Sequence, residues 1–384
     1  MNKAQNDFMM LLKNALLQEN NLTDDIDYEA VGRIALNHLC LPLVCDGALK
    51  CGKNVPEKWK QHCAYVVANN YKNLTVQDEV LKLLNSNNIK CAVLKGITVS
   101  KYYPEPLCRP LGDIDILVEK DKYDAAIDLL TGSSERDSER LKHKFHYGFS
   151  FKNISVEIHK YITEYKNNER SMLLKKYFDN ALNTVTYGEY DGFAFPMLAP
   201  ELQVLAVVSH TQRHFAVRGA TMRMLCDFGM LVQNIADGQW NNEIYPALKE
   251  VGLQQFTDAL LSVCDKYLGL DFKGKLWQTI DENLTEELLE ELLREGIAPE
   301  YIDTRELNLA GKIKNIFTAI HEIAERDFKI TEKCPVLYPV FFVYVPLRAV
   351  FRKITGKRKN TDVLGYCSYY SKRNAIRKKL DIFE

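Results

Sequence analysis

The sequence lacks several features that would place it in a specialised class of protein. Its 384 residues contain no apolar run of about eighteen residues, the length that a membrane-spanning helix needs, and no signal-peptide cleavage pattern near the N-terminus. Internal repeats and low-complexity segments are also missing. With 46% hydrophobic and 26% charged residues, the composition excludes a collagen-like, coiled-coil or wholly disordered chain. We therefore expect a cytoplasmic globular protein of two or three domains.

The ten cysteines do not follow a metal-binding pattern. No Cys-x-x-Cys pair occurs, and the gaps between Cys40, Cys45, Cys51 and Cys63 are irregular. A zinc site is not expected from such spacing, and ten cysteines in a chain of this length do not indicate a small disulfide scaffold. Reduced thiols are the default expectation.

An excess of charge of one sign is also missing, since 50 Lys and Arg residues face 51 Asp and Glu residues. A protein that binds nucleic acid over a broad surface usually carries a basic excess, so stable nucleic-acid binding is not expected. Residues 347–384 are the exception, with eleven basic and three acidic side chains. Together with the apolar residues 335–351, this tail could lie on an anionic membrane surface. Pro339 and Pro346 interrupt a helix there and favour a last core element followed by a solvated tail.

The periodicity of apolar residues predicts an α+β fold, with a small mixed-sheet core between helical regions. Apolar residues recur at helical spacing from the N-terminus to about residue 88 and again beyond residue 196. Between them, short apolar or alternating runs at residues 90–96, 113–119 and 145–162 are typical of strands. The predicted regions are a helical region at residues 1–88, an α/β core at 89–192, a helical domain at 193–330, and an apolar segment with a basic tail at 331–384.

The sequence Asp-Ile-Asp at residues 113–115 is the first candidate for chemistry. Side chains alternate across a strand, so Asp113 and Asp115 share one face while Ile114, Ile116 and Val118 occupy the other. Two carboxylates about 6–7 Å apart on a strand repel each other. A divalent cation between them removes that repulsion, and Mg²⁺ accepts one or two carboxylates together with substrate phosphates. Asp-x-Asp alone is a weak signal that also fits a solvated strand end.

Two further features strengthen the metal interpretation. Gly96 ends the preceding strand, where its backbone N–H could approach a phosphate. Glu157 lies between Val156 and Ile158 in an alternating segment, so its carboxylate faces away from the core. If that strand neighbours the Asp-x-Asp strand, three carboxylates converge and can hold two metal ions for attack on a phosphoryl group.

These segments resemble a known superfamily. The order of a strand ending in glycine, an Asp-x-Asp strand and a later third-carboxylate strand resembles the nucleotidyltransferases with the DNA polymerase beta catalytic core. More narrowly, LKG (94–96), YYPEPLCRPLGDIDILV (102–118), VEIHKYI (156–162) and HTQRHFAVRGATMRMLCDFGMLV (210–232) are similar to the uncharacterised bacterial nucleotidyltransferase family NTP_transf_5. The resemblance covers roughly residues 90–235 and is more specific for the superfamily than for any substrate.

The resemblance implies roles for residues of the core. Asp113, Asp115 and Glu157 match the catalytic and metal-binding carboxylates, with Mg²⁺ or Mn²⁺ as the ion. Lys95 and Gly96 match the turn that faces the triphosphate of an NTP such as ATP. The superfamily usually has Ser or Gly after this glycine. In this sequence Ile97 and then Thr98 follow, so Thr98 becomes the candidate hydroxyl for phosphate.

Basic and imidazole side chains complete the implied nucleotide site. Arg109 precedes the carboxylate strand and could neutralise phosphate charge, with a surface position as the alternative. His210, His214 and Arg218 are implied to line the nucleotide cleft, together with Arg213, Arg223 and Asp227. His210 and His214 are spaced i, i+4, but the Glu of a His-Glu-x-x-His zinc motif is absent. His159 shares the face of Glu157 and is either part of the site or an exposed strand residue.

One near-motif does not support a second nucleotide site. Residues 269–275 have the Gly-x-x-x-x-Gly-Lys spacing of a phosphate-binding loop, but Leu276 replaces the Ser or Thr that the loop requires. No predicted strand precedes it.

The sequence therefore predicts a Mg²⁺-dependent transfer of a nucleoside monophosphate from an NTP to an acceptor hydroxyl or phosphate, with release of pyrophosphate. The acceptor is a sugar, another small molecule, a peptide or a protein. One alternative is a catalytically weak nucleotide-binding sensor or antitoxin-like partner, suggested by the Gly96-Ile97 departure. The other is a non-enzymatic protein that uses its basic tail at a membrane surface.

Overall fold

The computed structural model describes residues 1–21, 25–132, 145–163, 165, 168–217 and 219–295, with a few positions between 340 and 382. Residues 1–297 and 380–384 form one compact unit and residues 298–379 a second. The architecture below is that of the first unit. Most of the predicted apolar segment and basic tail lies outside the described residues.

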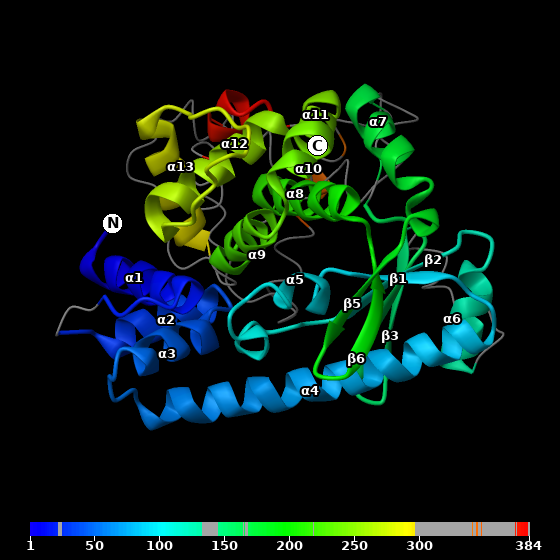
Figure 1. Cartoon of the computed structure of the whole chain (residues 1–384), viewed down its shortest axis with the longest axis horizontal. Coiled ribbons are helices and arrows are strands. Elements are labelled where there is room, and N and C mark those ends of the chain that lie inside the picture. The colour runs from blue at the N-terminus through cyan, green and yellow to red at the C-terminus, as the bar shows by residue number, and fades with distance from the viewer. Residues whose placement is uncertain are drawn as a thin grey trace. The chain divides into compact units, whose positions relative to one another are not determined.

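Four helices make up the N-terminal region (Figure 1). They are α1 (Lys3–Leu17), α2 (Tyr28–Asn37), α3 (Leu41–Lys50) and α4 (Glu57–Ser86). Local sequence explains where two of them begin. At α1 the side chains of Asn2 and Gln5 bond each other's backbone N–H in a capping box, and at α2 Asp27 accepts from two N–H groups of the first turn.

The central sheet of the described residues has six strands. They are β1 (Cys91–Leu94), β2 (Ile114–Val118), β3 (His146–Phe151), β4 (Ile154–His159), β5 (Thr186–Tyr190) and β6 (Phe193–Met197). Their order in the sheet is β3-β4-β2-β1-β6-β5. The β2–β4 and β1–β6 pairs are parallel and the other three are antiparallel, which makes the sheet mixed.

Short helices connect the strands, and a longer helical region follows them. The connecting elements are α5 (Ile97–Ser100), η1 (Pro106–Cys108), α6 (Tyr123–Thr131), α7 (Glu169–Phe178) and η2 (Ala181–Asn183). The helical region contains α8 (Pro200–Val217), α9 (Met222–Gln233), α10 (Asp237–Gln239), η3 (Trp240–Ile244), α11 (Tyr245–Glu250), α12 (Gln254–Val263), η4 (Cys264–Leu268) and α13 (Glu282–Glu295). The predicted α+β class, a mixed-sheet core with helical regions before and after it, is confirmed.

One face of the sheet is buried against helices α4 and α6. Ile114, Ile116 and Val118 of β2 and Val156 and Ile158 of β4 pack there with apolar side chains of α4 and α6. Figure 1 shows α4 running along the sheet on this side. The alternation read from the sequence is the physical cause, because it leaves the intervening carboxylates on the opposite face.

The sheet extends further along the chain than the boundary expected at residue 192. Strand β6 begins at Phe193 and pairs with β1, so a division at 192 would separate the two strands of the β5–β6 hairpin. The hairpin turn is Asp191-Gly192, and both residues have positive φ, 51° and 80°. Asp-Gly between alternating segments is a strong hairpin signal, and it marks the two strands that the periodicity analysis does not predict.

None of the helices in the described ranges is long and apolar enough to cross a membrane.

Candidate active site

The candidate site forms where β2 and β4 lie side by side. Because these strands pair in parallel, Asp115 lies directly opposite Glu157 and Leu117 opposite His159. The condition set by the sequence, that the Glu157 strand neighbours the Asp-x-Asp strand, is met in the structure. Asp113 is the residue immediately before β2, at the exposed edge of the cluster.

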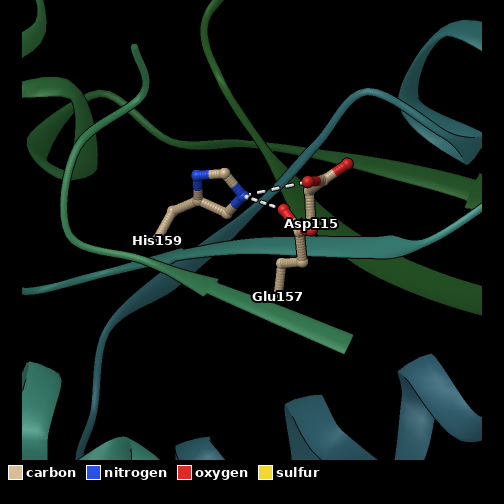
Figure 2. A group of neighbouring side chains, drawn as sticks. All are labelled: Asp115, Glu157 and His159. Atoms are coloured by element: carbon tan, nitrogen blue, oxygen red, sulfur yellow. Dashed lines mark hydrogen bonds and ion pairs between the residues drawn. The ribbon is translucent and has the colours of Figure 1, made fainter. Parts of the chain in front are cut away.

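His159 bridges the two carboxylates (Figure 2). Its Nε2 lies 2.9 Å from Oδ1 of Asp115 and 3.3 Å from Oε2 of Glu157. Ligand atoms of these three residues all lie within 4.8 Å of one another, and among the described residues no other group of His, Cys, Asp and Glu side chains meets that condition. His159 therefore belongs to the site, although the sequence left an exposed position equally open for it.

Lys95 contacts the other oxygen of the Asp115 carboxylate. Its Nζ lies 2.9 Å from Oδ2 of Asp115, so both oxygens of Asp115 have a nitrogen partner. Lys95 adopts a positive φ of 53°, which is unusual for a residue with a side chain. Gly96 follows with φ 53° and ψ −123°, a conformation that only glycine tolerates. This turn leads directly from β1 into α5 and places the Lys95 amine over β2.

The charges of the cluster move the pKa values of its members in different directions. Burial raises the pKa of Asp115, but Lys95 and His159 outweigh it and hold that pKa well below its usual range. The hydrogen bond from His159 is the main reason that the pKa of Glu157 is lowered. Burial favours the neutral form of His159, yet its hydrogen bonds to the two carboxylates raise its pKa.

Asp113 behaves differently from the two inner carboxylates. Desolvation on the side toward the cluster raises its pKa, and the negative charges of Asp115 and Glu157 raise it further. Three carboxylates thus share the site with Lys95 and His159, which leaves an excess of negative charge when His159 is protonated. This is the electrostatic setting that a divalent cation relieves.

The donor set fits such a cation. Mg²⁺ in proteins is usually held by one or two carboxylates and completes its shell with water and substrate phosphates. Asp115 and Glu157 supply carboxylates on adjacent strands, Asp113 lies one residue before β2, and His159 adds a nitrogen that Mn²⁺ accepts more readily than Mg²⁺. Each oxygen of Asp115 has a second lone pair, so an ion can bind Asp115 beside Lys95 and His159 or in place of one of them.

Arg109 occupies a different environment from the one predicted. The sequence suggests that its guanidinium faces phosphate, but the structure buries it at 3% exposure and pairs it with Asp227 of α9. Arg109 Nε and Nη2 donate to the two oxygens of Asp227 at 2.9 and 2.6 Å, and Nη1 donates to two carbonyls of its own loop. Tyr103 donates to the same Asp227 carboxylate at 2.7 Å. The pair therefore holds the loop before β2 in place and offers no face to a ligand.

Helix α4 holds the same loop through two buried asparagines. Asn70 Nδ2 donates to the carbonyls of Leu107 and Arg109, and its Oδ1 accepts from the N–H of Leu111. Asn73 donates to the carbonyl of Gly112, the residue before Asp113, at 2.7 Å. The backbone that presents Asp113 is thus fixed by a helix that the sequence assigns to a separate region.

Ile97 and Thr98, which follow the turn, are both buried. Ile97 is buried in the core, and the Thr98 hydroxyl donates to the carbonyl of Lys95 at 2.8 Å. Gln203 of α8 donates to the Thr98 carbonyl at 2.8 Å. These contacts stabilise the turn at Lys95 and Gly96, so the Thr98 hydroxyl, which the resemblance suggested for phosphate, supports the turn in the structure.

The histidines of α8 lie close to one another and within electrostatic reach of the cluster. The rings of His210 and His214 are 4.4 Å apart between centroids. Burial lowers the pKa of His210 well below its ordinary value, and the positive charges of Lys95 and His214 lower it further, so the ring is neutral. Arg218 lies outside the described residues.

Two further residues lie at the border of the site. His146 of β3 stacks on His159 at 5.1 Å between centroids and lies 3.8 Å from Glu157, because the β3–β4 register places the two histidines opposite each other. Arg223 of α9 donates to the Pro110 carbonyl, and its charge acts on Asp113. The hairpin register is the signal that could have revealed His146, whereas Arg223 was named only as part of a general polar lining.

A comparison with known protein families assigns the chain to one of them. The model of the uncharacterised nucleotidyltransferases, NTP_transf_5, matches residues 24–269, which is well over half of the chain. The chain belongs to this family. The match extends beyond the α/β core to helices α2–α4 and to α8–α12, so the predicted resemblance is confirmed and the family's region is longer than the motifs that suggested it.

Comparisons with individual proteins add little to the family assignment. No curated protein matches the chain. Among solved structures, this family member is similar to an antigenic nucleotidyltransferase-like protein from Paracoccidioides brasiliensis at 16% identity. The similarity covers 54% of this chain and 95% of that one, and the TM-score is 0.30. It does not inform the description of the site.

Proposed function

We propose that the protein transfers a nucleoside monophosphate from an NTP to an acceptor hydroxyl or phosphate in a Mg²⁺-dependent reaction. The observation that supports this most is the placement of Asp115 and Glu157 opposite each other on adjacent parallel strands, beside the Lys95-Gly96 turn. In this reaction the acceptor oxygen attacks the α-phosphorus, the bond from that phosphorus to the β-phosphate oxygen breaks, and pyrophosphate leaves. The proton of the acceptor passes to a base or to water.

The side chains divide this work between them. When bound, Mg²⁺ would supply positive charge that offsets the negative charge developing on the phosphates during transfer. Asp115 and Glu157, with Asp113 at the edge, are the residues that would hold it. Glu157 would accept the acceptor's proton, and its lowered pKa keeps its carboxylate ionised before transfer. Lys95, which contacts Asp115, would move to a phosphate, and His159 would keep the two carboxylates together as a positioning residue.

Calorimetry with each of the four common NTPs, with and without Mg²⁺, tests this proposal. The wild type is compared with the double variant Asp113→Asn/Asp115→Asn and with Asp78→Asn, which removes a carboxylate on the surface of α4 that is paired with Lys82. We expect Mg²⁺-dependent binding by the wild type and by Asp78→Asn, and its loss in the double variant. Thermal unfolding of all three proteins shows whether the double variant is folded. Absence of NTP binding by the folded wild type contradicts the proposal.

A nucleotide-binding sensor is the second candidate function. The observation that favours it is the occupation of both Asp115 oxygens by Lys95 and His159, together with the use of Thr98 inside the turn. Mg²⁺-dependent NTP binding without release of pyrophosphate, in the presence of a broad set of acceptors, would support the sensor over the transferase.

A further inference from the structure

A cavity of about 200 Å³ opens at the C-terminal ends of β2 and β4. Its sheet side is formed by Leu117 and by Tyr161, which follows β4. The segment after α7 forms another wall with Asp179, Asn180 and Asn183. None of the roles considered above uses this cavity.

The cavity adjoins the carboxylate cluster. Leu117 follows Asp115 by two residues, so it lies on the same face of β2 about 7 Å further along the strand. On β4, His159 Nδ1 lies 3.4 Å from the carbonyl of Tyr161, which lines the cavity. Tyr161 therefore connects the cavity lining to His159, which in turn contacts Glu157.

The cavity and the Lys95-Gly96 turn lie toward opposite ends of β2. Strand β1 runs antiparallel to β2 with Leu94 opposite Asp115, so Gly96 lies near the beginning of β2 and the cavity near its end. In phosphoryl transfer the attacking and leaving oxygens are roughly in line on opposite sides of the phosphorus. If pyrophosphate leaves from the side of the turn, the acceptor approaches from the side of the cavity.

The lining of the cavity indicates the chemistry of its ligand. The rings of Tyr161 and Tyr165 meet edge to face at 5.7 Å between centroids. The amine of Lys120 lies 5.3 Å from the centre of the Tyr161 ring and 2.6 Å from Asp179. Burial raises the pKa of Tyr165, and Asp179 raises it further, so its phenol remains a hydrogen-bond donor.

Charge in the lining is nearly balanced, whereas hydrogen-bonding groups are many. The lining contains the cations of Lys120 and Lys160 and the carboxylates of Glu119, Asp121 and Asp179. The side-chain amides of Asn180 and Asn183 add hydrogen-bond donors and acceptors at the rim. Hydroxyl groups both donate and accept hydrogen bonds. An acceptor molecule with several hydroxyl groups therefore matches this lining better than a protein side chain with a single hydroxyl. Aromatic rings provide flat apolar faces for the C–H bonds of a saturated ring.

We propose that this cavity binds the acceptor, and that the acceptor is a neutral polyhydroxylated ring such as a monosaccharide or cyclitol. The inference rests on the proposed nucleotidyltransferase function and specifies the substrate class of that site. One hydroxyl of the ring attacks the α-phosphorus of the NTP and loses its proton, while the bond to pyrophosphate breaks. The cavity volume suits one such ring.

The first test is direct binding, measured by saturation-transfer NMR with D-glucose, D-glucosamine and myo-inositol as probes. Asn183→Trp brings an indole to the exposed rim of the cavity, and Tyr161→Ala removes the aromatic wall. Asn87→Trp is the matched control, because it places the same ring on an exposed asparagine at the end of α4. We expect at least one probe to bind the wild type and Asn87→Trp, and to bind both cavity variants at least tenfold more weakly.

The second test follows transfer of label from an α-³²P-labelled NTP to the same probes, with Mg²⁺-NTP binding measured in parallel. We expect label on the probe that binds, its loss in Asn183→Trp, and a dissociation constant for Mg²⁺-NTP that changes less than twofold in that variant. Transfer that survives in both cavity variants would overturn the assignment. So would label that appears only on added protein.

Other results separate this proposal from the function on which it rests. Mg²⁺-NTP binding without binding or labelling of any probe overturns the sugar assignment and leaves the transferase proposal standing. A tenfold weaker binding of Mg²⁺-NTP by Asn183→Trp shows that the cavity holds the nucleoside, which also overturns the assignment. Probe binding by a wild type that binds no NTP removes both the transferase function and the acceptor role.

Discussion

Two clusters of charged side chains are built differently: one joins the loop that precedes β2 to α9, and the other lies at β2 and β4. In the first, Arg109 and Asp227 form a buried pair in which both carboxylate oxygens and most guanidinium N–H groups are bonded. In the second, Lys95 and His159 contact Asp115, and His159 also contacts Glu157, with Asp113 at the edge. The contacts of the first cluster hold a loop in place, whereas the second brings three mutually repelling carboxylates together, which does not help the chain to fold.

The comparison shows why residue type alone does not identify a functional residue. Arg109 and Asp115 lie only six positions apart in the sequence, and both belong to a motif that resembles a nucleotide site. A long-range contact to α9 assigns Arg109 to the scaffold, and a long-range strand pairing assigns Asp115 to the cluster. Substitutions test this assignment, because a change at Arg109 should affect mainly stability and a change at Asp115 mainly activity.

The largest effect is expected for Arg109→Met. It leaves the Asp227 carboxylate buried without its cation, and breaking a buried pair on one side costs about 3–5 kcal/mol of unfolding free energy. Urea unfolding measures the loss. In the double variant Arg109→Met/Asp227→Leu neither charge remains, so we expect it to be more stable than Arg109→Met alone. A loss below about 1 kcal/mol in the single variant would show that the pair does not hold the loop.

Asp115→Asn is expected to act mainly on activity. Loss of one group that stabilises a transition state through charge costs about 10²–10³-fold in rate. Relief of the repulsion with Asp113 and Glu157 offsets part of the lost contacts to Lys95 and His159, so stability should fall less than in Arg109→Met. Pyrophosphate release and urea unfolding are measured on the same samples. A variant that keeps wild-type transfer would place the chemistry elsewhere.

Lys95→Met is expected to have an intermediate effect on nucleotide binding. A hydrogen bond to a charged group contributes about 1.5 kcal/mol or more, so Mg²⁺-NTP should bind roughly tenfold more weakly. Calorimetry gives the dissociation constant. Lys152→Met serves as the control, because Lys152 pairs with Glu79 of α4 outside the site. Equal affinities of Lys95→Met and the wild type would limit Lys95 to pairing with Asp115.

The smallest effect is expected in the pH dependence of stability, measured without metal. The raised pKa of His159 means that its contribution is fully present below the ordinary histidine value of about 6.5. That contribution is lost as the pH rises through the folded-state pKa. The contribution of Asp115, whose pKa is lowered, is present above about 3.9 and is lost as the pH falls through the folded-state pKa.

The variant His159→Gln tests whether His159 causes this pH dependence of stability. Stability of the wild type should decline above pH 6.5 through His159, and the decline should be smaller in His159→Gln. The Arg109–Asp227 pair does not titrate in this range, because the pKa of Asp227 is lowered and that of Arg109 is raised. Urea unfolding at several pH values measures the difference. Identical slopes for the wild type and His159→Gln would mean that His159 is not protonated in the folded protein.

Much of the core follows from local patterns. Alternation and apolar runs predict the strands near residues 91, 114, 146 and 154. The inward and outward faces of β2 and β4 follow from the same alternation, because the side-chain period of a strand is two and involves no distant partner. Within the helical region predicted before residue 88, α2 and α3 are separate helices, and Leu39 between them adopts a positive φ of 59°.

The sequence by itself determined the residue types of the site, the faces on which they lie and the family to which the chain belongs. Only the tertiary structure decided which residues meet. It pairs β2 with β4 so that Asp115 faces Glu157, brings His159 between them, and directs Arg109 to Asp227. The physical reason is that alternation acts over two residues, whereas strand order and buried ion pairs depend on groups that lie 40 to more than 100 residues apart.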